Sequence, residues 1–337
     1  MAQNPTSGHS SYCVYGFEST LGTVSTSFPR PFGHGVKLSR SLKNNMDPIY
    51  GLGARNASAN VAKKLEGTCS VEFLLGAGET AIAHGGASWL RAVLGAVPTD
   101  GGATPYTHSY AESNTLASFS ISTGVELGTG DAVLNLIGCQ VNSCTISAAV
   151  DEVATVKLDC MYRTETMATS GIGSQVVPTE VPLTFAQGSI TVAGTSVGYV
   201  QSVELTISNN LELIWGLGSR YSTASTAKTR KYDLKMNVVF SDVTLLLEKF
   251  YGKAATVDAD DLLTMNPAGV ACVLTFTNGL TSSSTRSIVF TFANLHLNEH
   301  SLPLDVNEVV KEDVSGWCLS CTSIVVSNNT SADVSSP

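Results

Sequence analysis

Charge is scarce in this chain of 337 residues, and on balance it is acidic. Charged residues make up 14% of the sequence, against about 25% in typical soluble proteins. The 19 Lys and Arg are outnumbered by 28 Asp and Glu, a net charge of −9, which argues against a basic nucleic-acid-binding domain. With 43% hydrophobic residues the chain is also too apolar for intrinsic disorder. Such a surface suits packing against copies of itself, although an ordinary β protein of low charge fits equally well.

Long hydrophobic stretches are missing too. No segment approaches the roughly 18 apolar residues of a membrane-spanning helix, and the N-terminal MAQNPTSGHSSYC lacks the basic and apolar regions of a signal peptide. We therefore expect no membrane association, cytoplasmic synthesis and reduced thiols. The eight cysteines include a single C-x-x-C, Cys318–Cys321, without the second pair that a structural zinc site needs. They are expected to be buried free thiols that bind no metal.

Nucleotide-binding and metalloprotease motifs are also absent. The sequence has no Walker A motif and no H-E-x-x-H. Gly51-Leu52-Gly53 and Gly216-Leu217-Gly218 lack the third glycine and the strand-to-helix context of a dinucleotide site. The six histidines are scattered along the chain, which is poor material for acid–base catalysis. We expect neither enzyme activity nor a cofactor.

What the sequence does contain is an internal repeat. Residues 44–63 (NNMDPIYGLGARNASANVAK) match residues 209–228 (NNLELIWGLGSRYSTASTAK) at a constant offset of 165, with ten of the twenty positions identical. The residues that flank each block alternate between apolar and polar, as the two faces of a strand require. Each copy is therefore predicted to consist of a strand, a long polar connector that contains glycine, and a second strand.

Two further matches extend the repeat. Residues 89–95 correspond to residues 246–252, and both blocks have apolar residues at helical spacing followed by a glycine. A weaker match relates residues 141–153 to residues 297–309. The other apolar runs alternate and are separated by turn residues. The sequence therefore predicts a mainly β fold of two tandem β-sandwich or barrel domains, each with one packed α-helix and one long loop.

The repeat also sets the expected domain boundaries. The first domain covers residues 1–165, a linker covers 166–186, the second domain covers 187–322 and a flexible tail covers 323–337. The linker contains two prolines and has little periodicity of its own. The tail begins apolar and becomes rich in Ser and Asn.

Three kinds of segment resemble one known family. They are residues 15–23 (YGFESTLGT), residues 138–143 (GCQVNS) with the alternating strand that follows, and the repeated NNMDPIYGLGAR and NNLELIWGLGSR. In their order and combination they resemble the tail tube (major tail) proteins of long-tailed phages and related archaeal viruses, over most of the chain. The resemblance implies a structural virion protein that is made in the host cytoplasm and polymerises as stacked rings into the tail tube.

The resemblance also implies the number of chains and the partners. Six single-domain subunits close a ring in the usual members, so a duplicated chain would form a trimeric ring with pseudo-six-fold symmetry. The genome would pass through the lumen without specific binding, and we expect a neutral to negative lumen because a basic lining would hold phosphates. The tail tip, tape-measure and tail terminator proteins would be further partners. Two alternatives stay open: a virion adhesin or receptor-binding β-module, and the inner tube of a contractile injection system.

The two connectors are the candidate sites of contact between rings or between subunits. Their glycines permit positive φ, their Arg side chains can donate to a neighbouring carboxylate or carbonyl, and their aromatic and Ile residues can anchor in a neighbour. The alternative is that Gly-Leu-Gly is a turn that packs its Leu on its own domain. The candidate residues are Asn44, Asn45, Ile49, Tyr50, Gly51, Leu52, Gly53, Arg55, Asn209, Asn210, Ile214, Trp215, Gly216, Leu217, Gly218 and Arg220.

Overall fold

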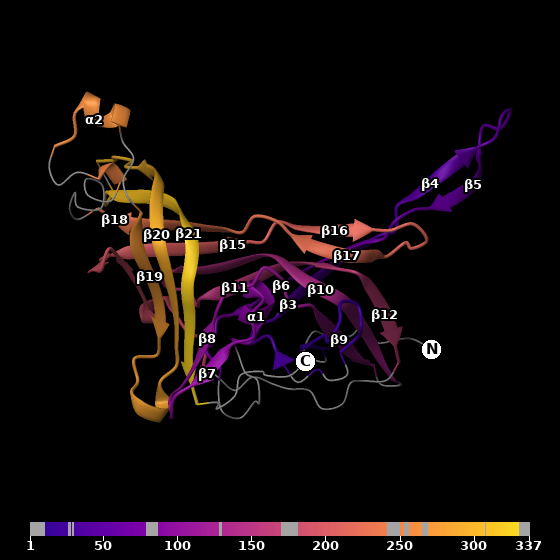
Figure 1. Ribbon diagram of the computed structural model, residues 1–337, viewed down its shortest axis with the longest axis horizontal. Helices are drawn as coiled ribbons and strands as arrows, with labels where there is room; N and C mark the ends of the chain where they lie inside the picture. The colour runs from indigo at the N-terminus through magenta and orange to yellow at the C-terminus, as the bar shows by residue number, and fades with distance from the viewer. Residues whose placement is uncertain are drawn as a thin grey trace.

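The fold is mainly β, as the sequence predicts, and Figure 1 shows a body of strands with a projection at each of two opposite ends. One projection is a two-stranded hairpin, and the other carries a short helix. The computed structural model describes residues 11–25, 28, 30–78, 87–127, 130–169, 181–240, 250–252, 256–264, 269–306 and 308–329.

Eight antiparallel strands form the sheet that runs through the body. Neighbouring strands are paired throughout, and the central pair joins a strand from the first half of the chain to one from the second half. The order is β3 (Lys37–Lys43), β6 (Glu66–Leu74), β11 (Thr155–Tyr162), β10 (Gly130–Ala149), β15 (Val200–Ser208), β18 (Lys231–Val239), β21 (Lys311–Asn328) and β20 (Ser287–Ser301).

Three of these strands, β10, β20 and β21, are long enough to pair with further strands outside this sheet. The first part of β10 pairs with β9 (Phe119–Leu127) and β12 (Thr164–Ala168), and β9 pairs with β1 (Ser11–Phe17). In the same way β20 pairs with β19 (Val270–Thr277), which pairs with β13 (Gly188–Val192). The remaining elements are β2 (Arg30–Pro31), β4 (Met46–Tyr50), β5 (Ala57–Ala62), α1 (Trp89–Leu94), β7 (Thr99–Gly101), β8 (Tyr106–Tyr110), the 3-10 turn Phe185–Gln187, β14 (Thr195–Ser196), β16 (Leu211–Trp215), β17 (Ser222–Ala227), α2 (Ala259–Thr264) and the 3-10 turn Ser282–Ser284.

The strands recur at the offsets of the sequence repeat. β4, β5 and β6 start 165 residues before β16, β17 and β18, and each strand has the same length as its counterpart. β11 and β21 start 156 residues apart, and the β-bulge between Val141 and Ser143 recurs between Leu297 and Glu299. The repeat in the sequence is therefore also a repeat of strands, pairings and bulges.

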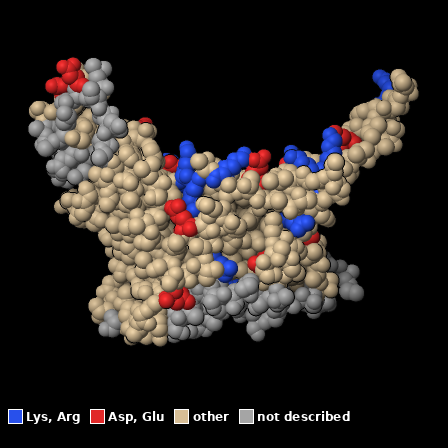
Figure 2. Space-filling view, in the orientation of Figure 1, with Lys and Arg blue, Asp and Glu red and all other residues tan. Residues whose placement is uncertain are grey.

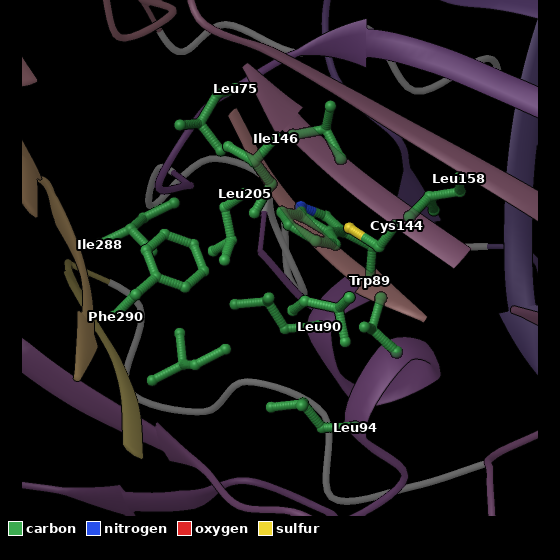
Figure 3. Close-up of a cluster of buried hydrophobic side chains, with 14 of the residues drawn as sticks. Leu75, Trp89, Leu90, Leu94, Cys144, Ile146, Leu158, Leu205, Ile288 and Phe290 are labelled. Atoms are coloured by element: carbon green, nitrogen blue, oxygen red, sulfur yellow. The ribbon is translucent and has the colours of Figure 1, made fainter. Parts of the chain in front are cut away.

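The hydrophobic core lies on one face of the eight-stranded sheet. Alternate residues of each strand point into it, so that Leu158, Ile146 and Leu205 come from three neighbouring strands. Figure 3 shows these side chains around Trp89, together with Ile288 and Phe290 from the second half of the chain. A single buried cluster thus includes side chains from both halves, and each large apolar side chain in it contributes roughly 1.5–3 kcal/mol of transfer free energy.

The helix expected over residues 89–95 is confirmed as α1, whose apolar residues are buried in this core. It ends at Gly95, which has φ of 96° and donates its backbone N–H to the Arg91 carbonyl. A Cβ at Gly95 would lie 2.2 Å from the Thr115 carbonyl oxygen, so the position requires glycine for space as well as for conformation. The second expected helix falls mostly on residues 241–249, which lie outside the described residues.

The expected linker and tail differ in part from the structure. β12 occupies Thr164–Ala168, and Leu183 is buried with its backbone N–H bonded to the Leu75 carbonyl at 2.8 Å. Residues 323–328, expected to begin a flexible tail, continue β21 because Ile324 and Val326 alternate into the core while the strand pairs with β20 and β8. Residues 170–180 and 330–337 lie outside the described residues.

All eight cysteines lie in the described part of the chain, and all are free thiols. Seven are buried, and Cys13 is half-buried. Burial raises the pKa of Cys272, Cys318 and Cys321 to about 12 each, because a thiolate loses its hydration inside the core. These thiols therefore stay protonated and pack as small apolar side chains.

Candidate functional site: the two hairpins

Each connector predicted from the repeat forms a β-hairpin with the same local structure. β4 pairs with β5 and β16 pairs with β17, and a bulge falls at the fourth residue of β4 and of β16. A hydroxyl from the second strand donates to the carbonyl at this bulge, from Ser58 to Ile49 at 3.1 Å and from Thr223 to Ile214 at 3.2 Å. The two hairpins therefore share their strand pairing, their bulge and this hydroxyl bond.

The tips of both hairpins turn at glycine in open space. Gly53 has φ of 84° and Gly218 has φ of 88°, values that side chains with a Cβ rarely adopt. The leucines between the glycines, Leu52 and Leu217, are fully exposed. The alternative interpretation, in which Gly-Leu-Gly packs its Leu on the body of the same chain, is therefore wrong.

Asparagines stabilise the root of each hairpin, by which we mean the residues just before its first strand and just after its second (44–45 with 63–66, and 209–210 with 228–230). Asn45 and Asn210 have φ of 24° and 48°, and their amides donate to the Lys64 and Thr229 carbonyls at 3.0 and 2.6 Å. Short polar side chains suit this backbone conformation because they can bond locally. Hydrogen bonds from Lys64 and Asn45 lower the pKa of Glu66 at the same root.

Next to the root of each hairpin, an ion pair links its two chain segments. Lys63 pairs with Asp47 in the first hairpin, and Lys228 pairs with Glu212 at 2.6 Å in the second. All four side chains are exposed, so these pairs contribute little to stability. They instead give both hairpins the same pattern of charge next to the root.

The β16–β17 hairpin lies across the root of the β4–β5 hairpin. The Trp215 indole donates to the Leu65 carbonyl at 3.3 Å, and the Lys64 ammonium lies 4.5 Å from the centre of its ring. Arg220 donates from Nε to the Lys63 carbonyl at 2.7 Å and from Nη2 to Asn44 Oδ1. The structure thus places one candidate connector directly on the other, between segments that come from the two halves of the chain.

None of the described residues supports the β4–β5 hairpin in this way, and the hairpin extends away from the body (Figure 1). Every residue of β4 and β5 is exposed, and Tyr50, the counterpart of Trp215, is exposed to 62%. Arg55, the counterpart of Arg220, is exposed and makes no hydrogen bond to any residue that the structure describes. Two hairpins of one sequence type therefore occupy different environments.

Asn44 and Asn209 show the same divergence. Asn44 is exposed and accepts from Arg220, whereas Asn209 is buried and donates to the Val93 and Val141 carbonyls at 3.0 and 3.1 Å. The Arg230 guanidinium completes the site by donating to Asn209 Oδ1 at 2.8 Å. Asn209 therefore joins the two halves of the chain from inside the molecule and is not available to another subunit.

Sequence reasoning missed the residues that surround Asn209. Arg230 also donates to the Leu94 and Ser113 carbonyls, and Glu112 accepts from Tyr232 at 2.6 Å and from the Cys321 backbone at 2.8 Å. Burial and the bond to Glu112 raise the pKa of Tyr232. The bonds of Arg230 to Leu94 and Ser113, and those of Tyr232 and Cys321 to Glu112, span more than 100 residues each, so no local pattern could have pointed to them.

Besides the two hairpins, the structure has a large polar surface on the face of the eight-stranded sheet opposite the core. Ion pairs link Lys37 to Glu72 at 2.6 Å and Lys235 to Glu204 at 3.3 Å. Figure 2 shows basic and acidic side chains interleaved on the concave side between the two projections. Following the strand registers, the face carries Lys37, Lys43, Lys157, Lys231, Lys235, Lys311, Glu66, Glu72, Asp159, Glu204, Asp233, Glu299 and Asp313.

The seven acidic and six basic residues of this sheet face almost cancel. In the parts of the chain that the structure covers, no group of three or more His, Cys, Asp or Glu residues is arranged to hold a metal ion. Likewise, no described helix has the length and apolar character needed to cross a membrane.

Comparison with known proteins found one matching family. The family model described as "Phage tail tube protein" matches residues 8–316, which is nearly the whole chain. No curated protein matches the sequence. The match covers both hairpins and seven strands of the central sheet in full, together with the first residues of β21.

The two asparagines make a matched pair of variants. Asn209→Ala removes buried hydrogen bonds and leaves carbonyls inside the protein without a partner, so we expect a loss of about 2–3 kcal/mol in the free energy of unfolding. Asn44→Ala removes an exposed side chain and is expected to change the free energy of unfolding by less than about 0.5 kcal/mol. Urea unfolding of the unassembled chain measures both. Equal losses would contradict the different roles assigned here.

The two arginines make a second pair. Arg220→Ala removes the bonds that hold β16–β17 to the first hairpin root, so amide hydrogen exchange across residues 211–227 of the unassembled chain should accelerate about five-fold, the equivalent of one hydrogen bond. Arg55→Ala should leave exchange in residues 46–62 unchanged before assembly. Hydrogen-exchange mass spectrometry checks both, and an unaltered Arg220→Ala profile would count against the observed seating of the hairpin.

Proposed function

Because the chain belongs to the phage tail tube protein family, we propose that it assembles into the tail tube as stacked rings of three chains, through which the viral genome is delivered. Each ring has pseudo-six-fold symmetry because each chain contributes two tandem domains of the same type, joined through residues 166–186. The repeated strands, registers and bulges support this duplication.

The observation that carries the proposal is how the two halves of the chain meet. β10 of the first half pairs with β15 of the second half, which joins their strands edge to edge in one sheet. The equivalent strands at the two ends of the eight-stranded sheet are β3 and the last part of β20, and among the described residues neither has a second partner there. A contact that joins one end of a chain to the other end of the next is heterologous and closes into a ring when the geometry allows.

Three chains of eight strands close a barrel of suitable width. Closed barrels of about 16–18 strands already leave an aqueous channel, and diameter grows roughly linearly with strand number. With strands about 4.8 Å apart and tilted by about 40°, a barrel of 24 strands would measure roughly 45–50 Å between opposite backbones. Such a barrel keeps a wide bore after side chains have taken their space.

The polar face of the sheet lines this bore. The other face carries the core and α1, a layer that needs the larger circumference outside the barrel. Lysines on the polar face alternate with acidic residues and pair with them, so the lining is close to neutral. Phosphates would gain little by binding there, since such binding depends on clustered Lys and Arg that release counterions.

The hairpin tips connect one ring to the next. Leu52 and Leu217 are fully exposed apolar side chains at the tips of the two hairpins, and burying one leucine against a neighbour is worth roughly 1.5–3 kcal/mol. Six tips per ring make this a large term for stacking. The tail tip and tail terminator proteins would bind the two ends of the tube, and the tape-measure protein would occupy its bore.

Electron microscopy of the purified protein tests the proposal. We expect long polymers of uniform width with a continuous bore, and mass measurement of the shortest closed particles should give three chains. Polymers without a bore, or isolated monomers under all assembly conditions, would contradict the tube. An adhesin or receptor-binding module would remain monomeric or form small oligomers.

The leucine tips give a separate prediction. The double variant Leu52→Ser, Leu217→Ser should still form rings, because the edge strands are unchanged, but tube length in micrographs should fall at least ten-fold. The control is Val97→Ser, which removes another exposed apolar side chain outside the hairpins. Normal tube length in the leucine variant would show that other residues carry ring stacking.

A further inference from the structure

We propose that residues 298–306 of one chain form an antiparallel strand pair with β3 of the next, with Glu299 opposite Lys43 and Asp305 opposite Lys37. This inference rests on the proposed ring and deepens it by naming the strands, their direction and their register. The occupant of each exposed edge is a second copy of this chain.

The register follows from the pairing already present within the chain. Ser143 of β10 lies opposite Ser208 of β15, and Ala149 lies opposite Ser202. The bulges and pairings of β10 and β20 correspond at an offset of 156, and β15 corresponds to β3 at an offset of 165. Applying both offsets places residue 299 opposite 43 and residue 305 opposite 37.

Backbone hydrogen bonds fit this register. At the two ends of the β10–β15 pair, Val150 donates to the Gln201 carbonyl at 3.0 Å and Asn209 donates to the Asn142 carbonyl at 2.8 Å. The backbone N–H and C=O groups of the even-numbered residues of β10 therefore point toward β15. The counterparts of these residues are 298, 300, 302, 304 and 306. Pro303 falls between them, so its missing N–H is not needed by the neighbouring chain. Proline is accepted at such edge positions.

Burial points to the same segment. Leu304 is 75% exposed and Val306 is 99% exposed, although Ala148, the counterpart of Leu304, is only 3% exposed. β10 continues to Ala149, whereas β20 ends at Ser301, four residues before the position equivalent to Ala149. The difference between the two strands is that β10 pairs with β15 at this end, whereas the end of β20 has no such neighbour among the described residues. Pairing with β3 would extend β20 and bring Leu304 opposite Leu38.

Charge makes the contact selective. β3 carries Lys37, Arg40 and Lys43 along its seven residues, and Lys on an edge strand opposes pairing with a second identical edge. The segment after Leu297 instead offers Glu299 and Asp305 at the positions opposite the two lysines. Oppositely charged residues directly across a strand pair are favourable, and like charges there are not. Charge therefore disfavours pairing of β3 with a second β3 and favours pairing of β3 with residues 298–306.

An engineered disulfide tests the register. Ser41 and Ser301 should lie directly opposite, like Thr145 and Thr206, whose hydroxyl oxygens are 3.4 Å apart. This is a pair without backbone hydrogen bonds between its members, whose Cα atoms lie about 4.5 Å apart, within the range for disulfides. Tubes of Ser41→Cys, Ser301→Cys, oxidised with excess oxidised glutathione, should give covalent trimers on non-reducing gels. The control Ser39→Cys, Ser301→Cys adds the same number of thiols two residues out of register and should give at least ten-fold less.

The outcomes separate this inference from the proposed function. If the wild type forms tubes but the control cross-links as well as the test variant, or neither cross-links, the register is wrong and the tube stands. If the wild type forms no tubes, the proposed function itself fails. If the cysteine variant does not assemble, charge reversal decides: Lys43→Glu should reduce assembly at least ten-fold, and adding Glu299→Lys should restore most of it. Absence of rescue would overturn the register.

Discussion

The pairing of β10 with β15 is the contact on which the rest of the structure depends. Seven consecutive residue pairs join a strand from the first half of the chain to one from the second. The apolar side chains on one face of both strands, Ile146 and Leu205 among them, continue a single core. Because an open strand edge exposes a row of unpaired backbone groups, this contact leaves the two outer edges of the sheet as the places where further pairing can occur. The sheet thereby acquires two different ends and a direction in which chains can add.

The hairpins show how one sequence pattern can serve two environments. The bonds inside each hairpin are the same, but Trp215 and Arg220 are seated on the root of the first hairpin, while Tyr50 and Arg55 extend from the body. Asn209 is enclosed where the two halves meet, whereas Asn44 stays at the surface. In the proposed ring the difference has a simple cause. The partner of the second hairpin belongs to the same chain, and the partner of the first belongs to the next one.

Local features were predictable from the sequence, and contacts between distant segments were not. The strands that flank each connector, the glycines at its turn and α1 follow from patterns a few residues long: strand alternation, turn glycines and a helical apolar stripe ending at Gly95. The connectors themselves were expected as long loops, and their pairing into β-hairpins was not predicted. The exposure of the tip leucines was foreseen as one of two alternatives. The β10–β15 pairing could not be read from any single segment, because its register depends on two strands about 60 residues apart. Arg220 binds the Lys63 backbone carbonyl, a type of partner that has no sequence signal. Residues 323–328 were assigned to a flexible tail because the strands with which they pair lie elsewhere in the chain.

The scarcity of charge gains a physical meaning from where the charges lie. The core and the hairpin tips need few ionised groups, whereas ion pairs occur on the polar sheet face and at the base of each hairpin. On the sheet face nearly every lysine has an acidic residue within one strand or two positions, so the local potential cancels over distances shorter than the Debye length of about 8 Å at physiological salt. A wholly acidic face would repel its own strands during closure, and a basic one would retain a polyanion. Alternating basic and acidic residues avoid both the repulsion and the retention. In the proposed ring, the opposite charges of β3 and residues 298–306 also favour pairing between these two edges.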